Sequence, residues 1–164
     1  MTINLNSTIR LLPADWPLPG PIDLALHDRP HTSSTMEWWY VHSHATTIDN
    51  RRFSLFAAFF RVEVSDDGDD PAEKHYQHFL TWALVDLAGQ RYFPHTLIDR
   101  GAPGSALKQI DRGRGPRDSR LARALREVVA QGRVPLPDRL LTRDGQVDVE
   151  GVAIDLDGNR LRKS

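Results

Sequence analysis

The chain has 164 residues, of which 40% are hydrophobic and 26% are charged, and its formal net charge is -1. This length suits one hydrophobic core, and the balanced charge argues against a nucleic-acid partner, because phosphate binding needs a surplus of Lys and Arg. The sequence contains no cysteine, which excludes disulfides and thiolate metal sites.

Prolines punctuate residues 1–30. They remove backbone donors and disfavour helices, so we predict an extended N-terminal segment over this range. The segment also lacks a basic start followed by an apolar run, and no stretch nearby approaches the length needed to cross a bilayer. We therefore expect a cytoplasmic protein with no transmembrane segment.

Four runs rich in aromatic and branched residues follow, and their composition predicts an antiparallel meander. The predicted strands are Glu37–Ala45, Phe53–Val64, His75–Leu87 and Arg91–Leu97. Asp49-Asn50 supplies the first turn and residues 87–90 supply the last, while the acidic run at 66–71 is typical of a solvated loop.

Residues 100–138 look different from this meander. Glycine, proline and arginine gather over residues 100–117 without apolar periodicity, which predicts an irregular connection. Asp118 can cap one helix near residues 118–131, and Gly132 is placed to end it. We interpret residues 100–138 as a loop-helix insertion.

The last part of the chain predicts an incomplete sheet. Asp144-Gly145 signals a hairpin, one alternating strand spans about 147–156, and only a few residues follow the next turn. All 13 aromatic residues lie at or before Phe93, so the second part must borrow its packing from elsewhere. We expect residues 31–164 to be a truncated domain whose open edge is covered by a missing domain or a second chain.

The densest chemical feature is the strand from Met36 to His44. Alternation places Trp38, Tyr40, His42 and His44 on one face and Glu37, Trp39, Val41 and Ser43 on the other. Glu37 is either a buried ion-pair partner, for instance of Arg61, or a proton acceptor in a pocket with Tyr40 as donor.

On the third strand, the residues from Tyr76 to Asp86 that share a face form an apolar wall containing His78 and Trp82. This pattern suits a pocket for an apolar ligand. The alternative is structural, with His78 bonding a neighbouring strand or Glu37.

Other chemistries are disfavoured by spacing. His42 and His44 share a face, but His75 and His78 fall on opposite faces, so we expect no bound metal. The chain has no G-x-S-x-G elbow of a hydrolase and no glycine-rich nucleotide loop.

Three motifs occur in a recognisable order: His31 with Glu37-Trp38-Trp39-Tyr40, then Phe59-Phe60-Arg61, then the run from His78 to Asp86. Over residues 27–99 the chain resembles the N-terminal domain of the carotenoid 1,2-hydratase (hydroxyneurosporene synthase)/AttH family. The resemblance implies a mainly β fold, an antiparallel lipocalin-like β-barrel, with a second such domain following it. It also implies an apolar substrate and no organic cofactor.

Residue types and resemblance together predict a cofactor-independent hydratase, cyclase or isomerase of an apolar isoprenoid or polyketide-derived substrate. Glu37 and His78 are the predicted proton-handling residues. The predicted substrate-binding residues are Trp39, Tyr40, Phe60, Arg61 and Trp82. Two alternatives stay open, a non-catalytic carrier of a lipid or pigment and a hydrolase of unrecognised design.

Overall fold

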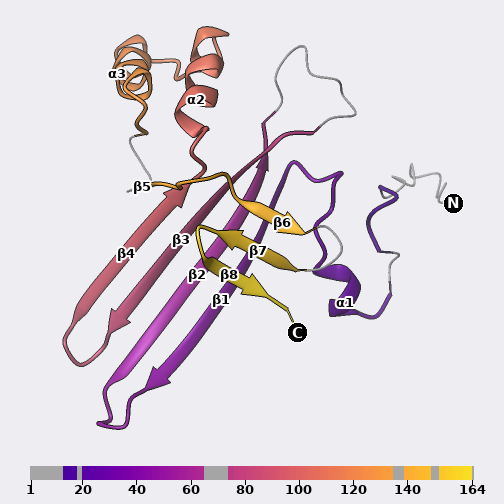
Figure 1. The fold of residues 1–164 in the computed structure, drawn as a ribbon, viewed down its shortest axis with the longest axis vertical. Coiled ribbons are helices and arrows are strands. Elements are labelled where there is room, and N and C mark those ends of the chain that lie inside the picture. The colour runs from indigo at the N-terminus through magenta and orange to yellow at the C-terminus, as the bar shows by residue number, and fades with distance from the viewer. Residues whose placement is uncertain (1–12, 18–19, 65–73, 135–138, 149–151, 164) are drawn as a thin grey trace, which may run out of the picture.

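The computed structural model describes residues 13–17, 20–64, 74–134, 139–148 and 152–163. They form a mainly β structure in which a small sheet lies across one face of a large sheet, and two helices project beyond one end of it (Figure 1).

The large sheet is an antiparallel meander of four long strands. They are β1 (Met36–Thr46), β2 (Arg52–Glu63), β3 (Tyr76–Asp86) and β4 (Arg91–Ile98). The four predicted strands are confirmed to within two residues at each end. At the predicted turns, Asn50 and Gln90 have φ values of 61° and 49°, the left-handed conformation that tight hairpin turns require.

A fifth strand, β5 (Arg139–Leu140), pairs in parallel with β4, so the order is β1-β2-β3-β4-β5. The described residues form no pairing that returns from β5 to β1, and the large sheet is therefore open. The barrel we predicted is not closed in this part of the chain. The acidic run at 66–71 lies outside the described residues.

The helices correct the prediction of a single one. As predicted, Asp118 caps α3 (Ser119–Ala130) by accepting from the amides of Arg120 and Leu121, and Gly132 beyond it has a φ of 71°. Residues expected to be irregular form α2 (Ala102–Asp111), whose Pro103 lies in the first turn, where its missing N–H costs nothing. A short α1 (Leu24–His27) interrupts the segment predicted to be extended.

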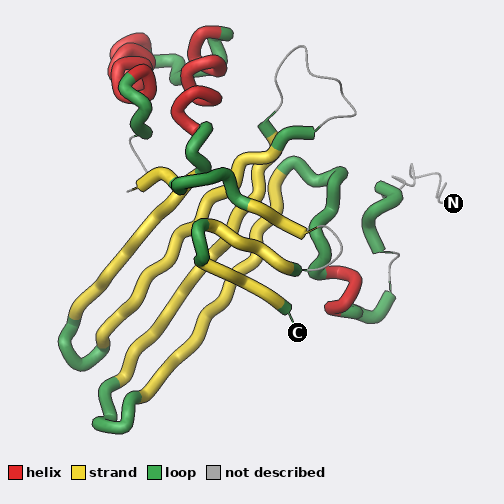
Figure 2. The backbone as a smooth tube through the Cα atoms, viewed as in Figure 1, coloured by secondary structure: helices red, strands yellow, loops and turns green. Residues whose placement is uncertain are grey.

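None of the helices in the described ranges combines the length and the apolar character that spanning a bilayer demands. Helices α2 and α3 contact each other, and Arg126 of α3 forms an ion pair with Asp111 at the end of α2. Both helices extend away from the strands rather than cover a sheet face (Figure 2).

The small sheet also differs from the prediction. The single strand expected at 147–156 is two antiparallel strands, β6 (Gln146–Asp148) and β7 (Ala153–Leu156). Asp144-Gly145 does not turn a hairpin, because β5 pairs with β4 and not with β6. The prediction that the final strand lacks a returning partner is wrong, since β8 (Asn159–Arg162) pairs with β7 after the turn at Asp157-Gly158.

The core lies between the two sheets. Phe59, Leu80 and Leu97 of the large sheet pack against aliphatic residues of the chain's second part: Leu141, Val152, Ile154 and Leu156. This packing confirms that the second part takes its aromatic contacts from the first. The face of the meander that carries Phe59, Leu80 and Leu97 is therefore the enclosed one.

Candidate functional site

The predicted site residues divide between the two faces of the large sheet. Cross-strand register places Glu37, Trp39, Arg61, His78 and Trp82 on the face that the small sheet covers. Tyr40 and Phe60 lie on the opposite face, where Tyr40 is 64% exposed. The structure therefore does not bring Tyr40 and Glu37 together as a donor and acceptor pair.

Glu37 lies in a buried polar network with Arg61 and His31. The Arg61 guanidinium donates to one carboxylate oxygen of Glu37 and, at 2.9 Å, to the backbone carbonyl of His31. The backbone amide and Nδ1 of His31 each lie 2.8 Å from the other carboxylate oxygen. The face of the Tyr76 ring covers the guanidinium, with its centroid 4.3 Å away. The structural alternative of a Glu37–Arg61 ion pair is thus realised.

Two members of this network, His31 and Arg61, each retain a buried nitrogen without a hydrogen-bond partner among the described residues, His31 Nε2 and Arg61 Nε. A carboxylate only accepts hydrogen bonds, so the contact with Glu37 places the proton on Nδ1. The ring nitrogen Nε2 is buried and has no hydrogen-bond partner among the described residues. His31 and Glu37 both belong to the H…EWWY motif, so nothing in the motif itself distinguishes His31 as the proton-transfer residue.

A short N-terminal stretch closes over His31. The Trp16 ring lies 5.0 Å from the imidazole, centroid to centroid, and its Nε1 donates to Ser33 Oγ at 3.0 Å. Asp15 accepts from the Ser33 amide at 2.8 Å and from Thr32 Oγ1 at 3.1 Å. Hydrogen bonds from Ser33 and Thr32 lower the pKa of Asp15 to about 2, so this carboxylate is charged at neutral pH.

A pocket of about 360 Å³ adjoins the His31–Glu37 pair. Three tryptophans, Trp16, Trp38 and Trp39, line it together with charged and polar residues that include Asp28 and Arg29. Trp39 Nε1 donates to the Asp28 carbonyl at 2.9 Å. The pocket thus combines apolar surface with a histidine that a carboxylate holds in one orientation. Such a combination can transfer a proton to or from an apolar molecule.

His78 forms a second histidine–carboxylate pair on the same face. Asp99 accepts from the His78 amide at 2.6 Å, lies 3.0 Å from its Nδ1, and accepts from the Gly145 amide at 2.6 Å. A Cβ added to Gly145 would stand 2.8 Å from His78 Cβ, so the backbone there lies directly on the histidine. Asp99 was missed by the sequence reasoning, and its only signal was its place just after β4.

Trp82 packs at the margin of the core, and its ring meets that of His95 edge-on, with centroids 5.6 Å apart. It lies two positions along β3 from Leu80, away from the pocket beside His31. Of the predicted residues, Glu37 and Trp39 thus line the pocket directly.

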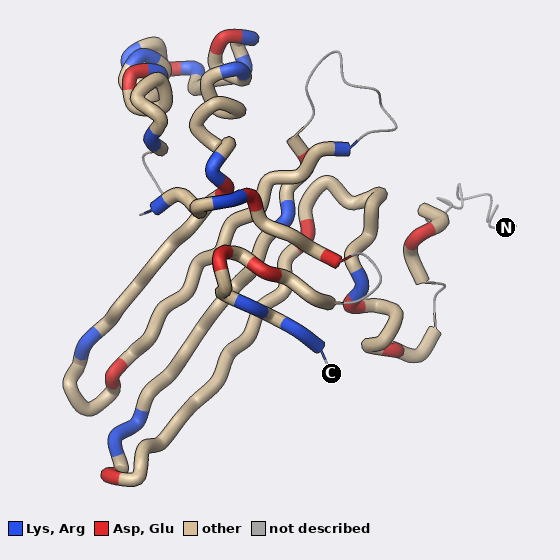
Figure 3. The backbone as a smooth tube through the Cα atoms, in the orientation of Figure 1, with Lys and Arg blue, Asp and Glu red and all other residues tan. Residues whose placement is uncertain are grey.

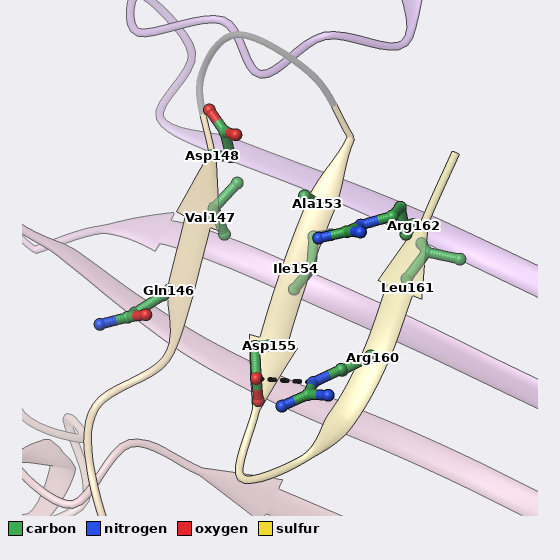
Figure 4. Close-up of a pocket in the computed structure, with 9 residues that line it drawn as sticks. All are labelled: Gln146, Val147, Asp148, Ala153, Ile154, Asp155, Arg160, Leu161 and Arg162. Carbon is green, nitrogen blue, oxygen red and sulfur yellow. Dashed lines mark hydrogen bonds and ion pairs between the residues drawn. The ribbon is translucent and has the colours of Figure 1, made fainter. Parts of the chain in front are cut away.

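Three other concave surfaces lie on the described part of the chain, and one of them, of about 420 Å³, is formed between β1 and β8 with Trp39 and Tyr40 in its lining. The outer face of the small sheet encloses about 760 Å³, where Asp155 is bonded by Arg160 at 2.9 Å (Figure 4). On the far face of the large sheet, about 400 Å³ is bounded by mostly apolar side chains: Met36, Trp38, Tyr40, Phe56, Ala58 and Phe60. The concavity on the small sheet is open and polar, whereas the only ionisable group that lines the far-face concavity is the Tyr40 phenol.

His42 and His44 lie side by side on the far face, with ring centroids 4.8 Å apart, and His42 Nε2 is 3.1 Å from Ser54 Oγ. Within the described ranges, no three His, Asp or Glu side chains gather in a metal-binding arrangement. Comparisons of the chain with protein-family models, with curated proteins and with solved structures find no match.

Proposed function

We propose that this protein is a hydratase, cyclase or isomerase that moves a proton on an apolar isoprenoid or polyketide-derived substrate without an organic cofactor. The observation that carries the proposal is the buried, unpartnered Nε2 of His31, a residue that lines a pocket containing three tryptophans. A buried polar atom without a partner costs free energy, which a substrate group at that position would recover.

Glu37 is the positioning residue of this site. It fixes the Nδ1 proton of His31, so that Nε2 is the atom that accepts or donates the transferred proton. When Nε2 takes a proton, the adjacent carboxylate stabilises the imidazolium. Arg61, bonded to the other carboxylate oxygen, holds the Glu37 side chain in place.

In the proposed reaction, His31 Nε2 gives one proton to the substrate and takes one back. Protonated His31 delivers the Nε2 proton to an alkene or enol carbon, and the resulting cation faces the Trp16 and Trp39 rings, which attract positive charge. Loss of a proton from a neighbouring carbon, or from an attacking water, returns the proton to Nε2. The first route isomerises the substrate, or cyclises it when a second double bond attacks the cation and forms the new C–C bond before the proton is lost. The second route hydrates it.

The motif resemblance supports the same assignment. His31 and Glu37 are the first two residues of the H…EWWY element through which the chain resembles the carotenoid 1,2-hydratase/AttH family. We propose that the two sheets are a lipocalin-like domain of that kind. His78, enclosed between Asp99 and Gly145, then serves to fix the small sheet rather than to meet substrate.

A non-catalytic carrier is the second candidate, and the mostly apolar 400 Å³ concavity on the far face favours it. A carrier needs apolar surface for its ligand and no proton-transfer group. The two candidates therefore differ in which surface binds the ligand and in whether the ligand changes.

β-Ionone, an enolisable isoprenoid ketone, distinguishes them. In D₂O we expect the protein to speed deuterium incorporation next to the carbonyl, measured by mass spectrometry. His31→Gln should lose this acceleration by about 100-fold, whereas His42→Gln, on the far face, should keep it. Binding of β-ionone without exchange would favour the carrier, and exchange that survives His31→Gln would contradict the assignment of His31.

A further inference from the structure

The face of the large sheet that points away from the small sheet is apolar and exposed. Trp38 is 58% exposed, Tyr40 64%, Phe56 42% and Tyr92 65%. Strands β2 and β3 are nearly continuous apolar runs, a pattern typical of strands that are buried on both faces. The small sheet accounts for one buried face, and the described residues leave the other uncovered.

This face also lacks charge. Between Met36 and His44 on β1, and at the positions that the register aligns with them on β2 to β4, no outward-pointing residue is Asp, Glu, Lys or Arg. Charged residues along the long strands lie near their ends (Figure 3). We call this surface the aromatic face, defined by Trp38, Tyr40, Phe56, Phe60, Phe79 and Tyr92.

The aromatic face is ordered by contacts within one chain. Phe60 and Phe79 stack with centroids 4.1 Å apart and planes 8° from parallel, and Tyr40 lies 6.3 Å from Phe56. Because these rings already pack against one another, little side-chain conformational entropy is lost when a partner binds this surface.

We propose that the aromatic face binds the same face of a second copy of this chain, giving a symmetric dimer of two stacked sheets. In a dimer with a two-fold axis, the same surface of each copy meets itself. A surface without charge can do this with no repulsion between like charges. Sheets stack in this way at about 10 Å with their inner side chains interdigitated.

The dimensions fit a stable interface. Strands of 11, 12, 11 and 8 residues rise ~3.3 Å per residue and lie ~4.8 Å apart, so together they present roughly 670 Å². Two such faces together bury about 1,300 Å², within the ~1,200–2,000 Å² of ordinary specific complexes.

Sedimentation equilibrium of the full chain tests the proposal. We expect a mass twice the 18.6 kDa of one chain. Tyr40→Glu places a charge on the aromatic face of each copy and should weaken the dimer at least tenfold. Ile48→Glu is the matched control, since Ile48 is fully exposed in the turn after β1 and lies off the face, and it should leave the dimer unchanged.

A second measurement uses the absence of cysteine in the chain. Phe56→Cys should form an intermolecular crosslink with a short bifunctional maleimide, and Ile48→Cys should not. A monomer at 100 µM, a dimer that Tyr40→Glu leaves intact, or crosslinking at Ile48 alone would each overturn the proposal. A monomer whose aromatic face binds β-ionone would assign that face to a ligand instead.

Discussion

Glu37 and Arg61 are direct cross-strand partners on β1 and β2, and their side chains form an ion pair with 12% and 3% of their surfaces exposed. The same carboxylate holds His31, so one residue joins the strands to the N-terminal segment. Stability and the proposed chemistry thus depend on the same group.

Glu37→Gln should therefore destabilise the fold as well as alter activity. Removing one charge of a buried pair leaves the other uncompensated, at a cost of about 3–5 kcal/mol. Urea denaturation measures the loss. Glu63→Gln is the control, because the Glu63–Lys74 pair is more exposed and should cost no more than about 1 kcal/mol. Equal losses in the two variants would contradict the buried role of Glu37.

Gly145→Ala should loosen the small sheet from the large one. The added methyl would meet Leu156 and stand 2.8 Å from His78 Cβ, an overpacking that costs about 1–3 kcal/mol. Thermal unfolding followed by circular dichroism measures the change. Gly104→Ala, inside α2 with nothing within 4 Å, should instead be neutral or stabilising, and a normal melting temperature for Gly145→Ala would disprove the close contact.

Acid should release the stretch that covers His31. The pKa of Asp15 is lowered from 3.8 to about 2, so its stabilising contribution is complete above pH 3.8 and is lost as pH falls through about 2. The Ser33 amide, which Asp15 accepts, reports this titration by NMR. We expect its shift to titrate with a midpoint near 2 and the titration to vanish in Asp15→Asn; a midpoint at 3.8 would be inconsistent with the bonds described.

Asp118→Ala should weaken α3 without disturbing the sheets. Asp118 accepts from the Arg120 and Leu121 amides, and loss of such a cap costs about 1 kcal/mol. Hydrogen exchange should rise in residues 119–123 and stay unchanged in β2. Glu127→Ala, an exposed change in the same helix, serves as the control and should leave the first turn protected.

The meander was predictable because its signals are local. Alternation placed Glu37 and Trp38 on the correct opposite faces, and Asp118 marked a helix start by its own side chain. Pro103 misled the prediction of residues 100–117, because a proline that breaks a helix interior is tolerated in its first turn. Strand β8 was missed because Leu161 is its only apolar residue.

The site was less predictable, because it depends on contacts between distant segments. The Glu37 motif was visible, but the seating of Trp16 on His31 depends on where the N-terminal segment runs. The pairing of His78 with Asp99 needs the register of β3 and β4. Alternation along a strand predicts the sheet face on which a side chain lies, but it does not predict which residue of another segment that side chain contacts.

The contacts of Lys163 with Leu24 and Asp28 bear on the order in which the chain folds. The Lys163 ammonium bonds the Asp28 carboxylate at 2.8 Å and the Leu24 carbonyl, so residues from both ends of the described chain meet. Strands β1 to β4 are joined by connections of at most 12 residues. The Gly145–Asp99 contact beside the small sheet spans 46 residues, and the Lys163 contacts with Asp28 and Leu24 span 135 and 139. Because long loops close slowly, we expect the meander to form early and the Lys163–Asp28 ion pair, which holds one of the residues lining the pocket beside His31, to form last.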